Sequence, residues 1–149
     1  MMNQILPITK EFFIKRVADL CLRSGLTGFP KEDIDQQILL KSMALVIGKS
    51  HSLTEKEVNE KLQYWMLAIS KIKKLDHSSL RRWLVDAGYM TRTRDGSSYQ
   101  IVEHGPHDDW FAAEVETIDL AEEMQLKREE YERRKQEYLQ KSGQQGKAG

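Results

Sequence analysis

The chain has 149 residues with 23 basic and 23 acidic side chains, so its formal net charge is zero. This length fits one ordinary domain, or one small domain with extensions. A balanced charge excludes a global field that attracts nucleic acid, so any such attraction has to be local. The single cysteine, Cys21, excludes an intramolecular disulfide and a cysteine-rich zinc site. We expect a soluble cytoplasmic protein, because no signal-peptide pattern and no apolar run of membrane-spanning length is found.

Two helices are predicted in the first third of the chain. Apolar residues recur at helical spacing between Thr9, which suits an N-cap, and Ser24. The turn at Leu26–Pro30 separates this helix from a second one over about 32–47, since proline suits a helix start and cannot continue the helix before it. We interpret residues 1–28 as an N-terminal helical extension.

A capping box marks the start of a third helix. Thr54 and Glu57 have the spacing at which each side chain binds the other residue's backbone amide, and the apolar pattern behind them runs to about Lys73. Asp76 suits the N-cap of a fourth helix, whose apolar residues recur at i, i+3, i+4 and i+7. These residues are Leu80, Trp83, Leu84 and Ala87.

A β-hairpin follows the fourth helix, because the apolar period changes from helical to alternating. Asp95-Gly96 is a dipeptide favoured by two-residue type I′ loops, in which both residues need a positive φ. The pairs predicted by this loop are Arg94 with Ser97, Arg92 with Tyr99 and Met90 with Ile101. The fold class is therefore mainly α with a small β-hairpin, a winged helix-turn-helix-like domain over residues 29–103 followed by a long C-terminal helix. Its predicted core is Leu39, Met43, Val58, Leu62, Leu80, Trp83, Leu84 and Ile101.

The fourth helix and the hairpin are locally basic. Seven basic and two acidic residues lie between Lys71 and Arg94. In a winged helix the last helix enters the major groove and the wing contacts the DNA backbone, so these bases predict a surface for duplex DNA. The alternative is an ordinary helix and hairpin with solvated charges. The residues predicted for the DNA-binding surface are Arg81, Arg82, Arg92, Arg94, Lys73, Lys74 and Tyr99.

Nothing in the sequence predicts catalysis. It has no glycine-rich phosphate loop, no nucleophile elbow and no H-E-x-x-H, so we expect no enzymatic activity and no cofactor. His104, His107, Asp108 and Asp109 are potential ligands of a divalent ion. The Gly-Pro pair between the histidines is typical of a linker, and we interpret residues 104–109 as a solvated linker without a metal.

The C-terminal third has a helical pattern from about Asp109 to Lys141, and we assign residues 110–141 to one helix. Its second half carries i, i+4 charge pairs and is expected to be a solvated extension. Residues 142–149 are rich in glycine and glutamine and are predicted to be disordered. The first half carries an apolar stripe that we expect to dock within the chain, in a homodimer or on a protein partner: Trp110, Phe111, Val115, Ile118 and Met124.

Several ordered motifs resemble a known family. They are Phe29-Pro30-Lys31, the segment from Ser52 to Glu60, Asp76 with Leu80–Asp86, and Arg92–Tyr99. Together they resemble bacterial domain-of-unknown-function family 2087, which occurs alone or behind the DNA-binding domain of ArsR-type transcriptional regulators. The resemblance implies a winged-helix-like fold and an association with transcription regulators, and it implies no catalytic residues. The chain departs from the family in a longer segment between Tyr64 and Leu75.

These patterns together predict a DNA-binding, transcription-associated winged-helix protein. The alternative is a non-enzymatic adaptor that uses the winged-helix fold and the C-terminal helix for protein contacts. The two functions differ in a measurable way, because DNA binding through phosphates weakens as the salt concentration rises.

Overall fold

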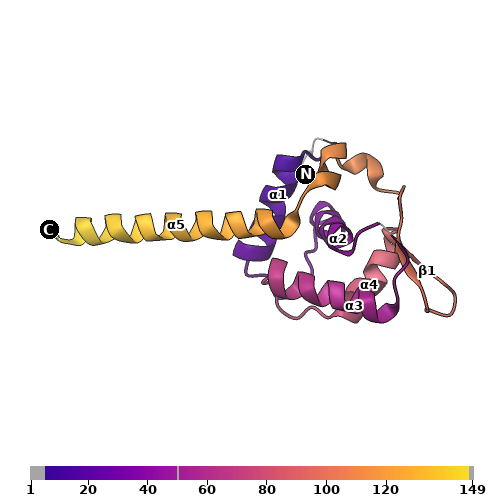
Figure 1. The fold of residues 1–149 in the computed structure, drawn as a ribbon. Helices are drawn as coiled ribbons and strands as arrows, with labels where there is room; N and C mark the ends of the chain where they lie inside the picture. Colours follow the sequence, from indigo (N-terminus) through magenta and orange to yellow (C-terminus); the bar gives the residue numbers. More distant parts are fainter. Residues whose placement is uncertain (1–5, 50, 148–149) are drawn as a thin grey trace.

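A computed structural model describes residues 6–49 and 51–147 of the chain. It is mainly α-helical, with one two-stranded hairpin and a long C-terminal helix, as the sequence predicted. Helices α1 to α4 and the hairpin form a globule, and α5 starts beside α1 and projects away from it (Figure 1). The elements are α1 (Lys10–Ala18), α2 (Asp33–Ile47), α3 (Glu55–Tyr64), α4 (His77–Asp86), β1 (Met90–Arg92), β2 (Tyr99–Ile101) and α5 (Leu120–Lys147). Two π-helical turns, η1 (Asp19–Arg23) and η2 (Trp65–Ile69), continue α1 and α3, and two 3-10 turns, η3 (Asp108–Trp110) and η4 (Ala113–Thr117), precede α5.

The helix starts are set by local side-chain caps, as predicted. The Thr9 hydroxyl accepts a hydrogen bond from the Phe12 amide at 3.1 Å. Thr54 and Glu57 form the reciprocal capping box, at 3.0 and 3.1 Å. Asp76 accepts from the Ser79 amide at 2.8 Å. Each cap satisfies an amide that has no partner inside its helix.

The third helix ends earlier than predicted. The helical segment stops at Ile69 rather than near Lys73. At this end the Ser70 amide donates a hydrogen bond to the Trp65 carbonyl at 3.0 Å. In the connection to α4, a backbone amide donates a hydrogen bond to the end of the first helical segment: the Lys71 amide donates to the Cys21 carbonyl at 2.8 Å. These tertiary hydrogen bonds replace the extra helical turn.

One core joins all the helices. The predicted core residues are buried, except for Trp83, which is only partly covered. Trp65 is fully buried, and its indole N–H donates to the Ser42 hydroxyl at 2.9 Å. Phe13 and Val17 of α1 belong to the same cluster. The described part of residues 1–28, predicted as an N-terminal helical extension, thus packs into the same core as the later helices.

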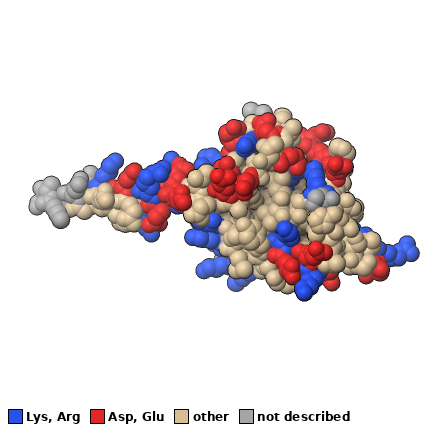
Figure 2. Space-filling view, in the orientation of Figure 1, with Lys and Arg blue, Asp and Glu red and all other residues tan. Residues whose placement is uncertain are grey.

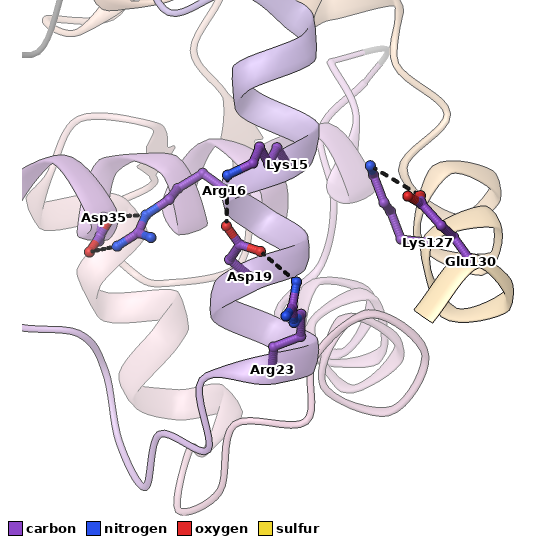
Figure 3. A network of polar contacts seen from close by, with 7 residues as sticks. All are labelled: Lys15, Arg16, Asp19, Arg23, Asp35, Lys127 and Glu130. Carbon is purple, nitrogen blue, oxygen red and sulfur yellow. Dashed lines mark hydrogen bonds and ion pairs between the residues drawn. The ribbon is translucent and has the colours of Figure 1, made fainter. Parts of the chain in front are cut away.

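A bidentate ion pair ties α1 to α2. The Arg16 guanidinium donates to both oxygens of Asp35, each at 2.8 Å, and Asp35 is buried (Figure 3). The hydrogen bond to Asp35 raises the pKa of Arg16. Because a buried carboxylate needs a partner, this pair fixes how the two helices sit on each other.

The hairpin has the predicted register but a different loop. Met90 pairs with Ile101 and Arg92 pairs with Tyr99. The loop contains four residues, closed by a hydrogen bond from the Thr93 amide to the Ser98 carbonyl at 2.9 Å. Gly96 has a positive φ of 73° but Asp95 does not, which rules out the type I′ turn. Leu53, just before α3, adds a single antiparallel bridge to Tyr99, so the element order is that of a winged helix.

The C-terminal stretch is not one helix from Asp109. Residues 108–117 form the η3 and η4 turns, and regular helix begins only at Leu120. Backbone pairing with Ile8 interrupts the helix around Phe111. The Ile8 amide donates to the Trp110 carbonyl at 2.7 Å, and the Ala112 amide donates to the Ile8 carbonyl at 2.9 Å. In the linker predicted over residues 104–109, His107 stacks on Tyr89 with ring centroids 5.8 Å apart, while His104, Asp108 and Asp109 are exposed.

The first turns of α5 are bound to the globule. Met124 is buried, and the Arg128 guanidinium donates to the Ala68 carbonyl at the end of η2. Arg23 lies over the Tyr131 ring at 4.7 Å. Farther along, Tyr138 and Leu139 are exposed, and the helix continues to Lys147 through most of the predicted disordered tail, 142–149. No helix in the described part of the chain is both long and apolar enough to cross a membrane.

Candidate nucleic-acid interface

An open groove of about 450 Å³ lies between α4 and the hairpin. It contains three of the four predicted arginines of this region. Its lining residues are Glu55, Ser78, Arg81, Arg82, Val85, Asp86, Arg92 and Tyr99. The groove is thus formed where the predicted recognition helix meets the predicted wing.

The solvent face of α4 forms one wall. Leu80 and Leu84 are fully buried, which fixes the rotation of the helix. Ser78, Arg82 and Asp86 then fall in an exposed i, i+4 row on the other side. Arg82 is therefore placed as predicted, with its guanidinium open to a partner.

Arg81 does not point freely outward, which corrects the sequence prediction. One of its guanidinium nitrogens lies 2.8 Å from the Glu55 carboxylate, and another donates to the side chain of Asn59. The same guanidinium lies over the Tyr99 ring, 5.8 Å from its centroid. Arg81 stands on the flank of α4 that faces α3, so its charge is used to join α3, α4 and β2.

Tyr99 is also placed differently from the prediction. It is only 4% exposed, because its backbone pairs with both Leu53 and Arg92 while its ring lies beneath Arg81. The residue borders the groove but has little surface to offer a base or a sugar. Its role in this structure is to support Arg81.

The hairpin contributes the second wall and the tip. Arg92 and Arg94 are exposed. A Cβ added at Gly96 would stand 2.6 Å from the Arg92 guanidinium, so glycine lets the two approach closely. Asp95 organises the loop by accepting from Thr93 and from both the amide and hydroxyl of Ser97, and these bonds lower its pKa to about 2.

Lys73 and Lys74 are exposed but do not line the groove. They lie in the connection before α4, where the Lys73 amide donates to the Leu26 carbonyl at 3.1 Å. The structure therefore brings Arg82 and Arg92 together and leaves the two lysines beside the start of α4. Sequence reasoning missed Glu55 and Asn59, because their contact with Arg81 joins two helices whose relative placement no local pattern reveals.

The acidic stretch from Asp108 to Glu123 does not line the groove. Its Glu116 binds Lys41 and Lys49 of the α2 region instead, the latter at 3.4 Å. Figure 2 shows acidic side chains gathered over the part of the globule where η3 and η4 lie in Figure 1, while basic atoms mark the hairpin tip. Glu55 and Asp86 are the acids that border the groove itself.

The histidine loop has a packing role in this structure. His104 lies 3.5 Å from Asp108, and His107 is held between Tyr89 and Trp110. Among the residues that the structure describes, no group of three or more His, Cys, Asp or Glu side chains is arranged to hold a metal ion.

The fold and the groove define a winged-helix-like helical domain with arginines on α4 and on the hairpin. The chain belongs to bacterial domain-of-unknown-function family 2087, described as an uncharacterized protein conserved in bacteria, whose profile matches residues 25–101. This confirms the resemblance inferred from the motifs. The match includes α2 to β2 and hence the groove, whereas α1 and α5 lie outside it. Comparisons with curated proteins and with solved structures found no match.

Proposed function

We propose that the protein binds duplex DNA through α4 and the hairpin, as a transcription-associated winged-helix protein without enzymatic activity. The observation that carries this proposal is the open groove with Arg82 on its helical wall and Arg92 on its hairpin wall. Helices enter the major groove, and arginine recognises both phosphates and base edges there. The resemblance to a family associated with transcription regulators supports the same function.

We assign the arginines different roles from the elements on which they lie. Arg82, on the helix, is the residue that reaches base edges, and Arg92 and Arg94, on the hairpin, contact phosphates. Arg81 holds the groove in shape from behind, because Glu55 and Asn59 already occupy its guanidinium. Its replacement acts on the geometry of the groove rather than on a DNA contact.

A salt-titrated binding assay with generic duplex DNA tests the proposal. The variant Arg92→Ala/Arg94→Ala should weaken binding to all sequences alike and reduce the slope of log K against log salt by about one per lost phosphate contact. Arg82→Ala should cost roughly 1–3 kcal/mol on a selected site and much less on random DNA. Arg133→Ala, which removes an exposed arginine on α5, is the matched control and should leave binding unchanged.

The DNA-binding proposal fails if the full chain shows no salt-dependent binding to duplex DNA. It also fails if the groove variants bind as tightly as the Arg133→Ala control.

An adaptor is the second candidate function, and the projecting half of α5 favours it. Tyr138 and Leu139 are 70% and 52% exposed on a helix that has left the globule. Exposed apolar groups on such a helix suit contact with another protein. If the protein is an adaptor, it should bind no DNA at low salt. The double variant Tyr138→Ser/Leu139→Ser should then abolish capture of its protein partner.

A further inference from the structure

A second charged site lies on the other side of the hairpin, between α2 and the loop that follows β2. Two adjoining hollows, of about 20 and about 210 Å³, share the side chains of Lys41 and Lys49. The narrow hollow is also bordered by Tyr89 and His107, and the wider one by Glu116. Of these five residues, only His107 was singled out from the sequence, as a potential ligand of a divalent ion.

Lys41 is an unusual residue to find here. It lies in the interior of α2 and is 6% exposed. An ammonium group has three N–H donors, yet within the described part of the chain that of Lys41 has one hydrogen-bond acceptor, Glu116, and otherwise lies 5.6 Å from the centroid of the Phe111 ring. A buried ammonium that keeps unused donors is costly unless something accepts from them.

Lys49 is the second cation of the cluster, and its ammonium also donates to the Glu103 carbonyl at 3.4 Å. Lys49 lies 3.4 Å from the same Glu116 oxygen that Lys41 binds. Burial alone raises the pKa of Glu116, but the hydrogen bond and the charge of Lys41 outweigh burial and hold the pKa below its ordinary value. Two ammonium groups therefore share one carboxylate. Asp108 borders the narrow hollow but faces His104, at 3.5 Å.

His107 supplies the other unsatisfied group. Its Nδ1 atom is buried and has no hydrogen-bond partner among the described residues. The ring cannot turn freely, since it stacks on Tyr89 with an angle of 5° between the planes and meets the edge of Trp110 at 4.9 Å. A polar atom held this way beside a small hollow suits a ligand oxygen.

We propose that the two hollows form a binding site for a small monocarboxylate, held by Lys41, Lys49 and His107. A carboxylate supplies acceptor oxygens for the ammonium donors that Glu116 leaves unused. The narrow hollow has room for about one water-sized group, and so for a carboxylate oxygen, while the wider one accepts a short apolar tail against Ala44 and Leu45. The site is separate from the groove and does not depend on DNA binding.

The site lies next to two of the elements that form the groove. The narrow hollow is bordered by Ala87 and Gly88, at the end of α4, and by Ile101 and Val102, at the end of β2. The Val102 amide donates to the Tyr89 carbonyl at 2.9 Å and closes the base of the hairpin, and the Tyr89 amide donates to the Leu84 carbonyl of α4 at 2.9 Å. A ligand here contacts the end of α4 and the end of β2, two of the elements that form the groove.

Amide NMR titration of the full chain with sodium acetate, sodium butyrate and sodium phosphate, at constant ionic strength, tests the proposal. We expect saturable shifts at Gly88, Gly105 and His107 with both carboxylates, and tighter binding of butyrate because its tail fills the wider hollow. Lys49→Gln should weaken butyrate binding about tenfold, as expected for the loss of a charged hydrogen bond. His107→Phe keeps the ring stack, removes the nitrogen and should weaken binding roughly threefold to tenfold.

Lys56→Gln is the matched control, because it removes an exposed lysine on α3 and should leave the affinity unchanged. Lys49 is partly exposed at the end of α2, so its variant tests the site even if His107→Phe does not fold. Absence of saturable shifts, or equal affinity in Lys49→Gln, overturns the site. Phosphate binding more tightly than either carboxylate overturns the assignment of the ligand.

Discussion

At the scale of single residues, neighbours in the sequence have different roles because successive positions of a helix point about 100° apart. Arg81 and Arg82 are adjacent, yet Arg81 binds Glu55 while Arg82 is open to solvent. The apolar stripe of α4 showed correctly which side is buried. It could not show that α3 also covers the flank on which Arg81 stands, because that contact depends on packing between helices.

The two tryptophans Trp65 and Trp83 provide a test of burial. Trp65→Phe removes the hydrogen bond to Ser42 and leaves a cavity in the core, so it should lower the free energy of unfolding by about 1–3 kcal/mol. Trp83 is partly exposed and rests on Phe29, with ring centroids 4.7 Å apart, and Trp83→Phe should cost less than about 1 kcal/mol. Urea denaturation measures both. Equal losses would show that Trp83 is as buried as Trp65.

Asp95 should make the hairpin loop sensitive to acid. Hydrogen bonds from Ser97 and Thr93 lower its pKa from the ordinary range of an aspartate to about 2. A carboxylate with a depressed pKa stabilises the folded loop above the unfolded pKa, and this contribution is lost as the pH falls through the folded pKa. Side-chain carboxyl NMR of Asp95 should therefore titrate near pH 2, and order in the loop should decrease between about pH 4 and pH 2. An ordinary pKa would mean that these hydrogen bonds are absent in solution.

At the scale of elements, boundaries set by local side-chain caps were predictable, and boundaries set by tertiary hydrogen bonds were not. The caps at Thr54 and Asp76 act within one turn, so the sequence contains all the information for them. The stop at Ile69 and the 3-10 turns before α5 depend on hydrogen bonds to distant backbone groups. The hairpin register was predicted because any symmetric loop between Arg92 and Tyr99 preserves it, although the loop has four residues rather than two.

Arg128 is the residue that joins α5 to the end of η2. Arg128→Met keeps most of the side-chain volume but removes the hydrogen bond to the Ala68 carbonyl, and it should destabilise the docked part of α5 by about 1.5–3 kcal/mol. Hydrogen exchange should then become faster at the amides of residues 124–131, with the amides of α2 unaffected. Arg133→Met is the control, since Arg133 is exposed. Identical exchange in both variants would contradict this role for Arg128.

At the scale of the whole molecule, the two ends of the chain complete one core. Ile8 forms a parallel bridge with Phe111, and the rings of Phe13 and Phe111 meet edge to face at 5.9 Å. The apolar stripe predicted as an interface is thus used within the chain: Phe111, Val115, Ile118 and Met124 are buried, and Trp110 is partly covered. The sequence left open whether this stripe meets its own chain or another, because periodicity identifies an apolar face and not its partner.

Two truncations should separate the docked and projecting parts of the C-terminal region. A chain ending at Asp109 loses the buried side chains from Phe111 to Met124 and should have a strongly reduced Tm or fail to fold. A chain ending at Arg133 loses a segment whose described side chains, in residues 134–143, are all exposed, so its free energy of unfolding should change by less than about 0.5 kcal/mol. Thermal denaturation followed by circular dichroism compares them. Equal stability of the two truncated chains would show that the segment is not part of the core.

The projecting α5 also determines how the molecule moves through solution. A helix of 28 residues is about 42 Å long at 1.5 Å per residue, and only its first turns are held against the globule. Such a shape has a larger friction coefficient than a sphere of the same mass. A single copy should therefore elute from a gel-filtration column ahead of globular standards of 17.4 kDa, at a volume that imitates a larger assembly. Light scattering or sedimentation equilibrium, which report mass independently of shape, should give the mass of one chain for that same peak if the protein is a monomer.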